Sequence, residues 1–111
     1  MRDELAGLVR GGEVHPRELV TEALHRIEDR DGELGAVVAL RADEALAESE
    51  TVDRTGPLAG LPLLVKDLSN VAGMRTTMGS PWLEAAPPAS SDDLVVARLR
   101  AAGAIVVGKS N

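Results

Sequence analysis

Residues 61–67 read Leu61-Pro62-Leu63-Leu64-Val65-Lys66-Asp67, an apolar run that stops at a charged pair. A continuous run of this kind predicts a strand that is buried on both faces, and proline is tolerated near the start of a strand. Residues 92–102 then have the apolar spacing of a helix, Gly103 ends it, and the β-branched run 104–107 predicts a second buried strand. The order strand, helix, strand predicts an α/β fold with a mixed β-sheet flanked by helices.

The first half of the chain predicts mostly helices. A short helix is expected from Asp3 to the Gly11-Gly12 pair, and Pro16 opens a second helix that Asp31-Gly32 is expected to end. Residues 36–40 could form a short strand, and residues 41–50 predict a third helix. We therefore divide the chain into leading helices over residues 1–54 and the start of a sheet core over residues 55–111.

Residues 68–91 contain many glycines, prolines and hydroxyl side chains and predict a long irregular segment. A long irregular segment between regular elements is more often functional, or covered by a partner, than a simple connection. Two strands that are buried on both faces cannot form a covered sheet alone. We therefore expect residues outside this chain, or another copy of it, to complete the sheet, which makes a homo-oligomer one possible state.

The composition argues against several classes of protein. The 12 basic and 18 acidic residues give a net charge of −6, whereas nucleic-acid binders need a basic face. Without cysteine and with only two histidines, the chain is not expected to hold a metal or another cofactor. No apolar run approaches the ~20 residues of a membrane span, and the N-terminus lacks the pattern of a signal peptide. We expect a cytoplasmic protein without a membrane partner.

Residues 103–110 match the letters of a phosphate-binding loop, with Gly103 and Gly108-Lys109-Ser110 at the required spacing. In such a site a strand comes first, the middle residues form a loop, and a helix follows. Here a predicted helix comes first and the middle residues are those of a strand. We therefore interpret the match as accidental.

Four other polar residues are weak candidates for catalysis. Asp92 and Asp93 are adjacent and point in different directions, which argues against a shared-proton dyad and favours a capping role at the helix start. His15 precedes a helix and His25 lies on it. Neither histidine has an orienting partner that the sequence reveals, so a surface or structural role is favoured.

Lys66 is the strongest candidate for catalysis. It directly follows a predicted buried strand, and active sites of α/β sheets form at the carboxyl ends of strands. Burial disfavours the charged form of a lysine, which is how lysines become general bases. The alternatives are an ion pair between Lys66 and Asp67, or a side chain that extends into water.

Three blocks of the sequence resemble the amidase signature family. They are residues 56–67, which include Val65-Lys66-Asp67, residues 72–80, and residues 92–111, which end in Gly108-Lys109-Ser110-Asn111. The blocks occur in the order and at the spacing of the family, and residues 18–27 and 36–47 resemble its leading helices. The resemblance implies the N-terminal part of a single amidase domain over residues 1–111.

The resemblance also implies an activity, the hydrolysis of the carbon–nitrogen bond of a carboxylic amide. In that family a serine attacks the carbonyl, and a second serine, held by a cis peptide, relays the proton to a lysine that matches Lys66. The Gly/Ser-rich block that carries both serines has no match among the scattered serines of this sequence. The chain thus resembles an amidase cut before that block, and we expect these 111 residues alone to be inactive and only marginally stable.

The substrate implied by the resemblance is a small-molecule amide, with no cofactor. The glutamine-hydrolysing A subunit of the tRNA-dependent amidotransferase is an alternative within the family. That subunit typically has Asn where this chain has Leu68, which favours a stand-alone amidase. A truncated copy without activity, or a small interaction module, is the alternative outside the enzyme class.

Overall fold

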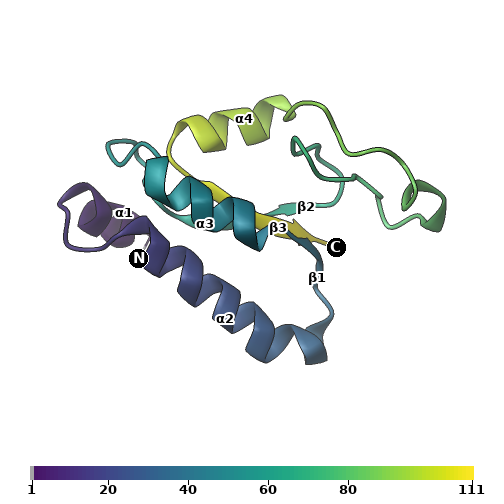
Figure 1. Cartoon of the computed structure of the whole chain (residues 1–111), viewed down its shortest axis with the longest axis horizontal. Helices are drawn as coiled ribbons and strands as arrows, with labels where there is room; N and C mark the ends of the chain where they lie inside the picture. Colours follow the sequence, from purple (N-terminus) through teal and green to yellow (C-terminus); the bar gives the residue numbers. More distant parts are fainter. Residues whose placement is uncertain (1) are drawn as a thin grey trace.

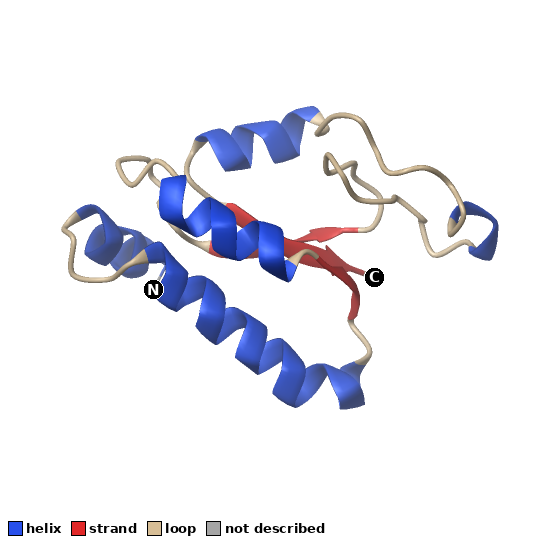
Figure 2. Ribbon diagram, in the orientation of Figure 1, coloured by secondary structure: helices blue, strands red, loops and turns tan. Residues whose placement is uncertain are grey.

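The structure, a computed structural model, describes residues 2–111 as one layer of strands between helices (Figures 1 and 2). In chain order the elements are α1 (Arg2–Arg10), α2 (Pro16–Leu34), β1 (Val37–Leu40), α3 (Ala42–Thr51), β2 (Pro62–Lys66), the 3-10 turn η1 (Pro81–Leu83), α4 (Leu94–Ala101) and β3 (Ile105–Ser110). None of the helices described is long and apolar enough to cross a membrane.

The three strands of the described sheet lie in the order β1-β3-β2. β1 is antiparallel to the central β3, whereas β2 is parallel to it. A strand–helix–strand unit, the usual connection between two parallel strands, runs from β2 through α4 to β3. The predicted α/β fold with a mixed, helix-flanked sheet is confirmed.

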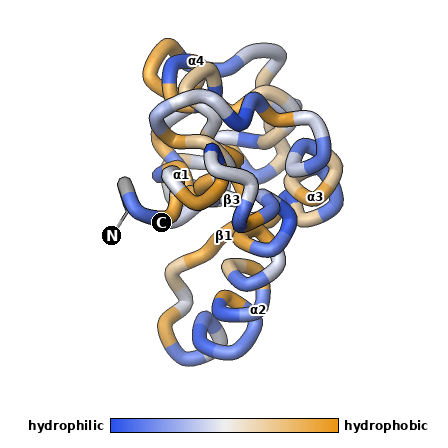
Figure 3. The backbone as a smooth tube through the Cα atoms, turned by 90° about the vertical axis from the view of Figure 1, so that its left-hand side faces the viewer, coloured by the Kyte–Doolittle hydropathy of each residue, from blue (hydrophilic) through white to orange (hydrophobic). Residues whose placement is uncertain are grey.

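The sheet separates two apolar clusters. On one face, Val96 of α4 packs against Val65 and Val106, together with Val71 and Met74 from the segment between β2 and α4. On the other face, the cluster joins α2 and α3 to β3 and consists of Val20, Ala45, Ile105 and Val107. The lower turns of α2 are largely hydrophilic (Figure 3), in keeping with the exposure of most residues after Ile27.

The two predicted strands differ in burial. β3 is buried from Ile105 to Lys109, and it continues past the predicted end at Val107 as far as Ser110. In β2, however, Leu64 is 38% exposed and Lys66 is exposed as well. The prediction that β2 is buried on both faces is wrong for the described residues, because β2 lies at the edge of their sheet and packs mainly through Val65.

Two predicted helix boundaries move by two residues or more in the structure. Helix α2 continues through Gly32 to Leu34 and ends at Gly35, whose left-handed backbone (φ 59°) lets its N–H bond to the Asp31 carbonyl at 2.7 Å. The side chain of Asp31 accepts from the backbone of Ala36 and so leads the chain into β1. Helix α4 begins at Leu94, two residues after the predicted start.

Candidate active site

Lys66 is the last residue of β2 and is exposed at the carboxyl end of that strand, where the sequence places it. The chain turns sharply after it, because the Lys66 carbonyl accepts from the N–H groups of Leu68, at 2.7 Å, and Ser69, at 3.1 Å. Lys66 lines a cleft of about 920 Å³ between the strand ends and the segment that follows β2. None of the described residues that line this cleft is a serine.

Asp67, the next residue, is buried and points into a set of donors. Its Oδ1 accepts from the backbone N–H of Thr77 at 3.0 Å, and its Oδ2 accepts from the Thr77 hydroxyl. Burial by itself would raise the pKa of Asp67, but the Thr77 hydrogen bonds and the ammonium of Lys109 outweigh it and lower the pKa below the ordinary value. Asp67 is therefore held as a carboxylate.

The partner of Asp67 is Lys109, and not the adjacent Lys66. Lys109 is fully buried in β3, and its Nζ lies 3.3 Å from Asp67 Oδ1. The same Nζ donates to the hydroxyl of Thr76 at 2.7 Å and to the carbonyl of Arg75 at 3.0 Å. Of the two alternatives considered for Lys66, the ion pair with Asp67 is absent from the described residues.

A β-bulge brings Lys109 to this place. The parallel register pairs Leu63 with Val106 but Leu64 with Gly108, so that β3 has one extra residue at Val107. A bulge shifts the alternation of side chains by one residue and re-aims those that follow. Lys109 consequently lies on the same face of the sheet as Val106, over the segment that follows β2.

Lys109 is a residue of this site for which the sequence predicts a role in stability or positioning and no catalytic role. It entered as a letter of the phosphate-binding pattern and as part of the last block that resembles the amidase signature family. The structure confirms that the phosphate-binding pattern is accidental, because residues 105–110 are a strand. One signal was available: a lysine that continues a β-branched strand has to find a buried partner for its charge. The partner itself, 42 residues away in the chain, was not visible in the sequence.

Asp92 and Asp93 hold the same segment from the other side. Asp92 Oδ1 accepts from the backbone N–H of Ala72, and Asp93 Oδ2 accepts from that of Asn70, both at 2.8 Å. Asp93 occupies the N-cap position of α4, but its side chain makes no capping hydrogen bond. The predicted capping role is therefore wrong, because the neighbouring irregular segment offers both carboxylates unpaired N–H groups.

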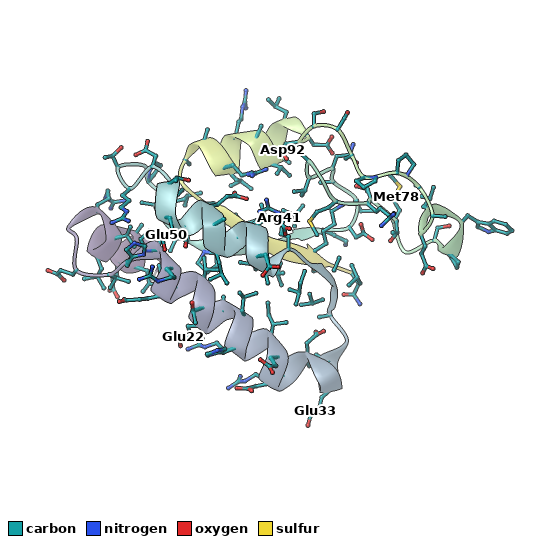
Figure 4. All side chains as sticks on the ribbon, in the orientation of Figure 1. Glu22, Glu33, Arg41, Glu50, Met78 and Asp92 are labelled. Atoms are coloured by element: carbon teal, nitrogen blue, oxygen red, sulfur yellow. The ribbon has the colours of Figure 1, made fainter. Side chains whose placement is uncertain are left out.

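A chain of charges connects Asp92 to the helices. Asp92 pairs with Arg100 at 3.0 Å, Arg100 pairs with Glu48 of α3 at 2.9 Å, and Glu48 also pairs with Arg41. Arg41 in turn donates to the Val106 carbonyl at 2.8 Å. Although partial burial alone would lower it, the pKa of Arg100 is raised by Glu48 and Asp92. Figure 4 labels Arg41 and Asp92, which lie between α3 and α4.

The two histidines lie away from the cleft. His15 Nδ1 accepts from the backbone N–H of Arg17 at 2.9 Å and so caps α2, while its other ring nitrogen lies 3.5 Å from Glu50. His25 is exposed on α2. Among residues 4–111, whose side chains the structure describes, no three histidine or acidic side chains form a group that could hold a metal ion.

Most of this chain matches one family of known proteins. The family described as Amidase matches residues 18–111. The A subunit of the glutamyl-tRNA(Gln) amidotransferase from Chromohalobacter salexigens is 40% identical over 114 residues, which cover 97% of this chain and 23% of that protein. The protein of the same name from Thermus thermophilus is 44% identical over 108 residues, covering 97% and 22%.

Solved structures of an amidase and of a hydrolase share the fold. The native peptide amidase from Stenotrophomonas maltophilia is 39% identical with a TM-score of 0.87, and the match covers 98% of this chain and 24% of that one. A 6-aminohexanoate cyclic dimer hydrolase in complex with its substrate is 33% identical with a TM-score of 0.89, covering 99% and 23%. The chain thus spans about a quarter of the length of these relatives.

Proposed function

This chain belongs to the amidase signature family, and we propose that it forms the N-terminal part of one amidase domain in which Lys66 is the general base. The observation that carries the proposal is the position of Lys66. It stands at the carboxyl end of a parallel strand, on the cleft, with no described ion-pair partner to hold its ammonium charged. A base must reach the reacting group, and a side chain that lines the cleft can reach a group bound there.

The proposed reaction is the hydrolysis of a carboxylic amide. A serine oxygen attacks the carbonyl carbon, while its proton passes through a second serine to the Nζ of Lys66. The carbon–nitrogen bond then breaks, the amine leaves with that proton, and water hydrolyses the acyl-enzyme. Both serines would come from the part of the domain beyond this chain. By itself the chain would therefore bind no acyl group and would be inactive.

A second candidate function is that of a glutamine-hydrolysing subunit. It is favoured by the curated relatives, amidotransferase A subunits that are 40–44% identical over 97% of the chain. Leu68 favours the stand-alone amidase, since the resemblance implies Asn at this position in those subunits. Assays of the full protein with glutamine and with simple aliphatic and aromatic amides separate the two. Release of ammonia from glutamine alone would support the glutamine-hydrolysing role.

The proposal also covers the substrate, the partners and the location of the protein. The substrate is a small-molecule amide, nucleic acid is not bound by this part of the protein, and the location is cytoplasmic. A homo-oligomer would fit the open edge of β2, where Leu64 is 38% exposed, although further strands of the same protein could cover it equally well. Sedimentation of the full protein measures the oligomeric state.

The test of the catalytic role is substitution of Lys66 in the full protein. Lys66→Ala should lower kcat by several orders of magnitude with little change in KM, because the base acts in the transition state. Lys66→Arg should not restore activity, since a guanidinium keeps its proton. The matched control is Arg26→Ala on the exposed side of α2, 73% exposed at its side chain, which should leave both constants unchanged. Full activity in Lys66→Ala would contradict the proposal.

A further inference from the structure

We propose that Asp67 and Lys109 are a buried positioning pair, which holds the cleft wall against the strand ends and cancels the negative charge of the residue that follows Lys66 in the chain. This inference rests on the proposed function, because it concerns the conditions under which Lys66 can act as a base. Neither residue is placed in contact with substrate. Both act through the position and the charge environment of Lys66.

The burial of Lys109 is fully compensated. An ammonium group has three N–H donors, and moving it out of water is costly unless each finds an acceptor. Here the three acceptors are the Asp67 carboxylate, the Thr76 hydroxyl and the Arg75 carbonyl. All three belong to the segment between β2 and α4, so the buried charge ties that segment to the sheet.

Both carboxylate oxygens of Asp67 accept hydrogen bonds. Its two oxygens accept from the backbone and hydroxyl of Thr77 and from Lys109. Its backbone is held too, because its N–H donates to the Ser110 carbonyl at 2.8 Å and its carbonyl accepts from Met78 at 3.0 Å. Thr77 and Met78 line the cleft together with Lys66. The pair therefore fixes the cleft wall at the residue that follows the base.

The pairing of the Asp67 carboxylate with the Lys109 ammonium affects the charge environment of Lys66. Asp67 lies in the turn that follows β2, and its carboxylate is paired with Lys109 and not with Lys66. An unpaired carboxylate next to a lysine favours the protonated lysine, which cannot act as a base. With Lys109 present, the pair is neutral, and Lys66 is spared that effect.

The other charged groups around the cleft are few. Arg75 and Glu84 line it from the segment after β2, and Arg41 and Glu44 line it from the start of α3. Arg41 is paired with Glu48. None of these four residues changes in the variants below, so a change in pH dependence would report the Asp67–Lys109 pair.

The experiment compares the pH dependence of kcat/KM in the full protein with Lys109→Met, Lys109→Gln and the double variant Asp67→Asn/Lys109→Gln. Lys66 must be neutral to act, so kcat/KM rises through an acid-side midpoint. Removal of Lys109 leaves the Asp67 charge uncancelled, and that midpoint should rise by about one pH unit, the size expected for one charge within ~10 Å at an effective dielectric constant of ~20. The double variant should bring the midpoint back to that of the wild type.

Controls separate this inference from the proposed function. Arg26→Met removes one positive charge from an exposed position on α2 and should leave the midpoint unchanged. Lys109→Gln keeps donors for Thr76 and Arg75 and provides a folded variant if Lys109→Met fails to fold. If Lys66→Ala is inactive but the Lys109 variants keep the wild-type midpoint, the pair is only structural and the inference is overturned. If Lys66→Ala is active, the proposed function itself fails.

Discussion

Val106 and Lys109 lie on the same face of the sheet although they are three residues apart in one strand. In a regular strand an odd spacing places two side chains on opposite faces. The extra residue at Val107 removes this alternation, so that Val106 joins the apolar cluster under α4 while Lys109 reaches Asp67. The bulge is therefore the local feature on which the buried ion pair depends.

The close pairing of β3 with β1 next to the bulge leaves no space for a side chain at Gly108. A Cβ there would lie 2.3 Å from the Ala39 carbonyl oxygen of β1. We expect Gly108→Ala to lower the free energy of unfolding of the full protein by roughly 2–3 kcal/mol, because backbone atoms have to move apart. The measurement is denaturant unfolding.

Gly32 provides the matched control for this substitution. It lies inside α2, and a Cβ there would meet no atom within 4 Å. Gly32→Ala should stabilise the protein by about 0.5–1 kcal/mol through helix propensity. Equal effects of the two substitutions would contradict the described packing of β3 against β1.

The cluster under α4 predicts a contrast between two adjacent valines. Val96 is 1% exposed, whereas Val95 is 57% exposed on the same helix. Val96→Ala should cost about 2 kcal/mol, because it leaves a cavity between α4 and the sheet. Val95→Ala should change the stability by less than about 0.5 kcal/mol. A larger loss at Val95, measured by thermal unfolding, would mean that α4 is rotated relative to the structure.

Asp67 predicts an acid dependence of stability. Its pKa is lower in the folded chain than the roughly 3.9 of an unfolded aspartate, so the folded state binds this proton less readily. Its contribution is therefore fully present above pH ~4 and is lost as the pH falls through the folded pKa. Asp67→Asn should remove that dependence, so that wild type and variant differ at pH 6 and converge towards pH 2.

The control for the acid dependence is Asp29→Asn, at an exposed position of α2. Its unfolding free energy should follow that of the wild type at every pH. Urea unfolding at a series of pH values measures both variants. A constant difference between wild type and Asp67→Asn down to pH 2 would show that the carboxylate charge makes no contribution.

Asp92 predicts the behaviour of the segment between β2 and α4. Its carboxylate joins the Ala72 N–H to Arg100, and Asp92→Ala removes both contacts. We expect amide hydrogen exchange at residues 70–74 to become at least tenfold faster, with a loss of about 1–3 kcal/mol in stability. Asp43→Ala, at an exposed position on α3, should leave exchange in this segment unchanged. Unchanged exchange in Asp92→Ala would mean that other contacts hold the segment.

The order of elements and the place of Lys66 could be predicted because they depend on local patterns. The apolar run before Lys66, the helical spacing after Asp93 and the β-branched run up to Val107 each report the burial of one segment. A polar residue that ends an apolar strand lies where the strands of the sheet end, whichever neighbour that strand pairs with. The position of the candidate base therefore followed from the sequence.

The tertiary structure alone decided which charges meet. Lys109 and Asp67 are 42 residues apart, and their contact requires the parallel pairing of β2 with β3 and the extra residue at Val107. The roles of Asp92 and Asp93 changed from capping to holding a distant segment for the same reason. Hydrogen-bond partners across strands depend on register, and a shift of one residue turns a side chain to the other face, so no local pattern specifies them.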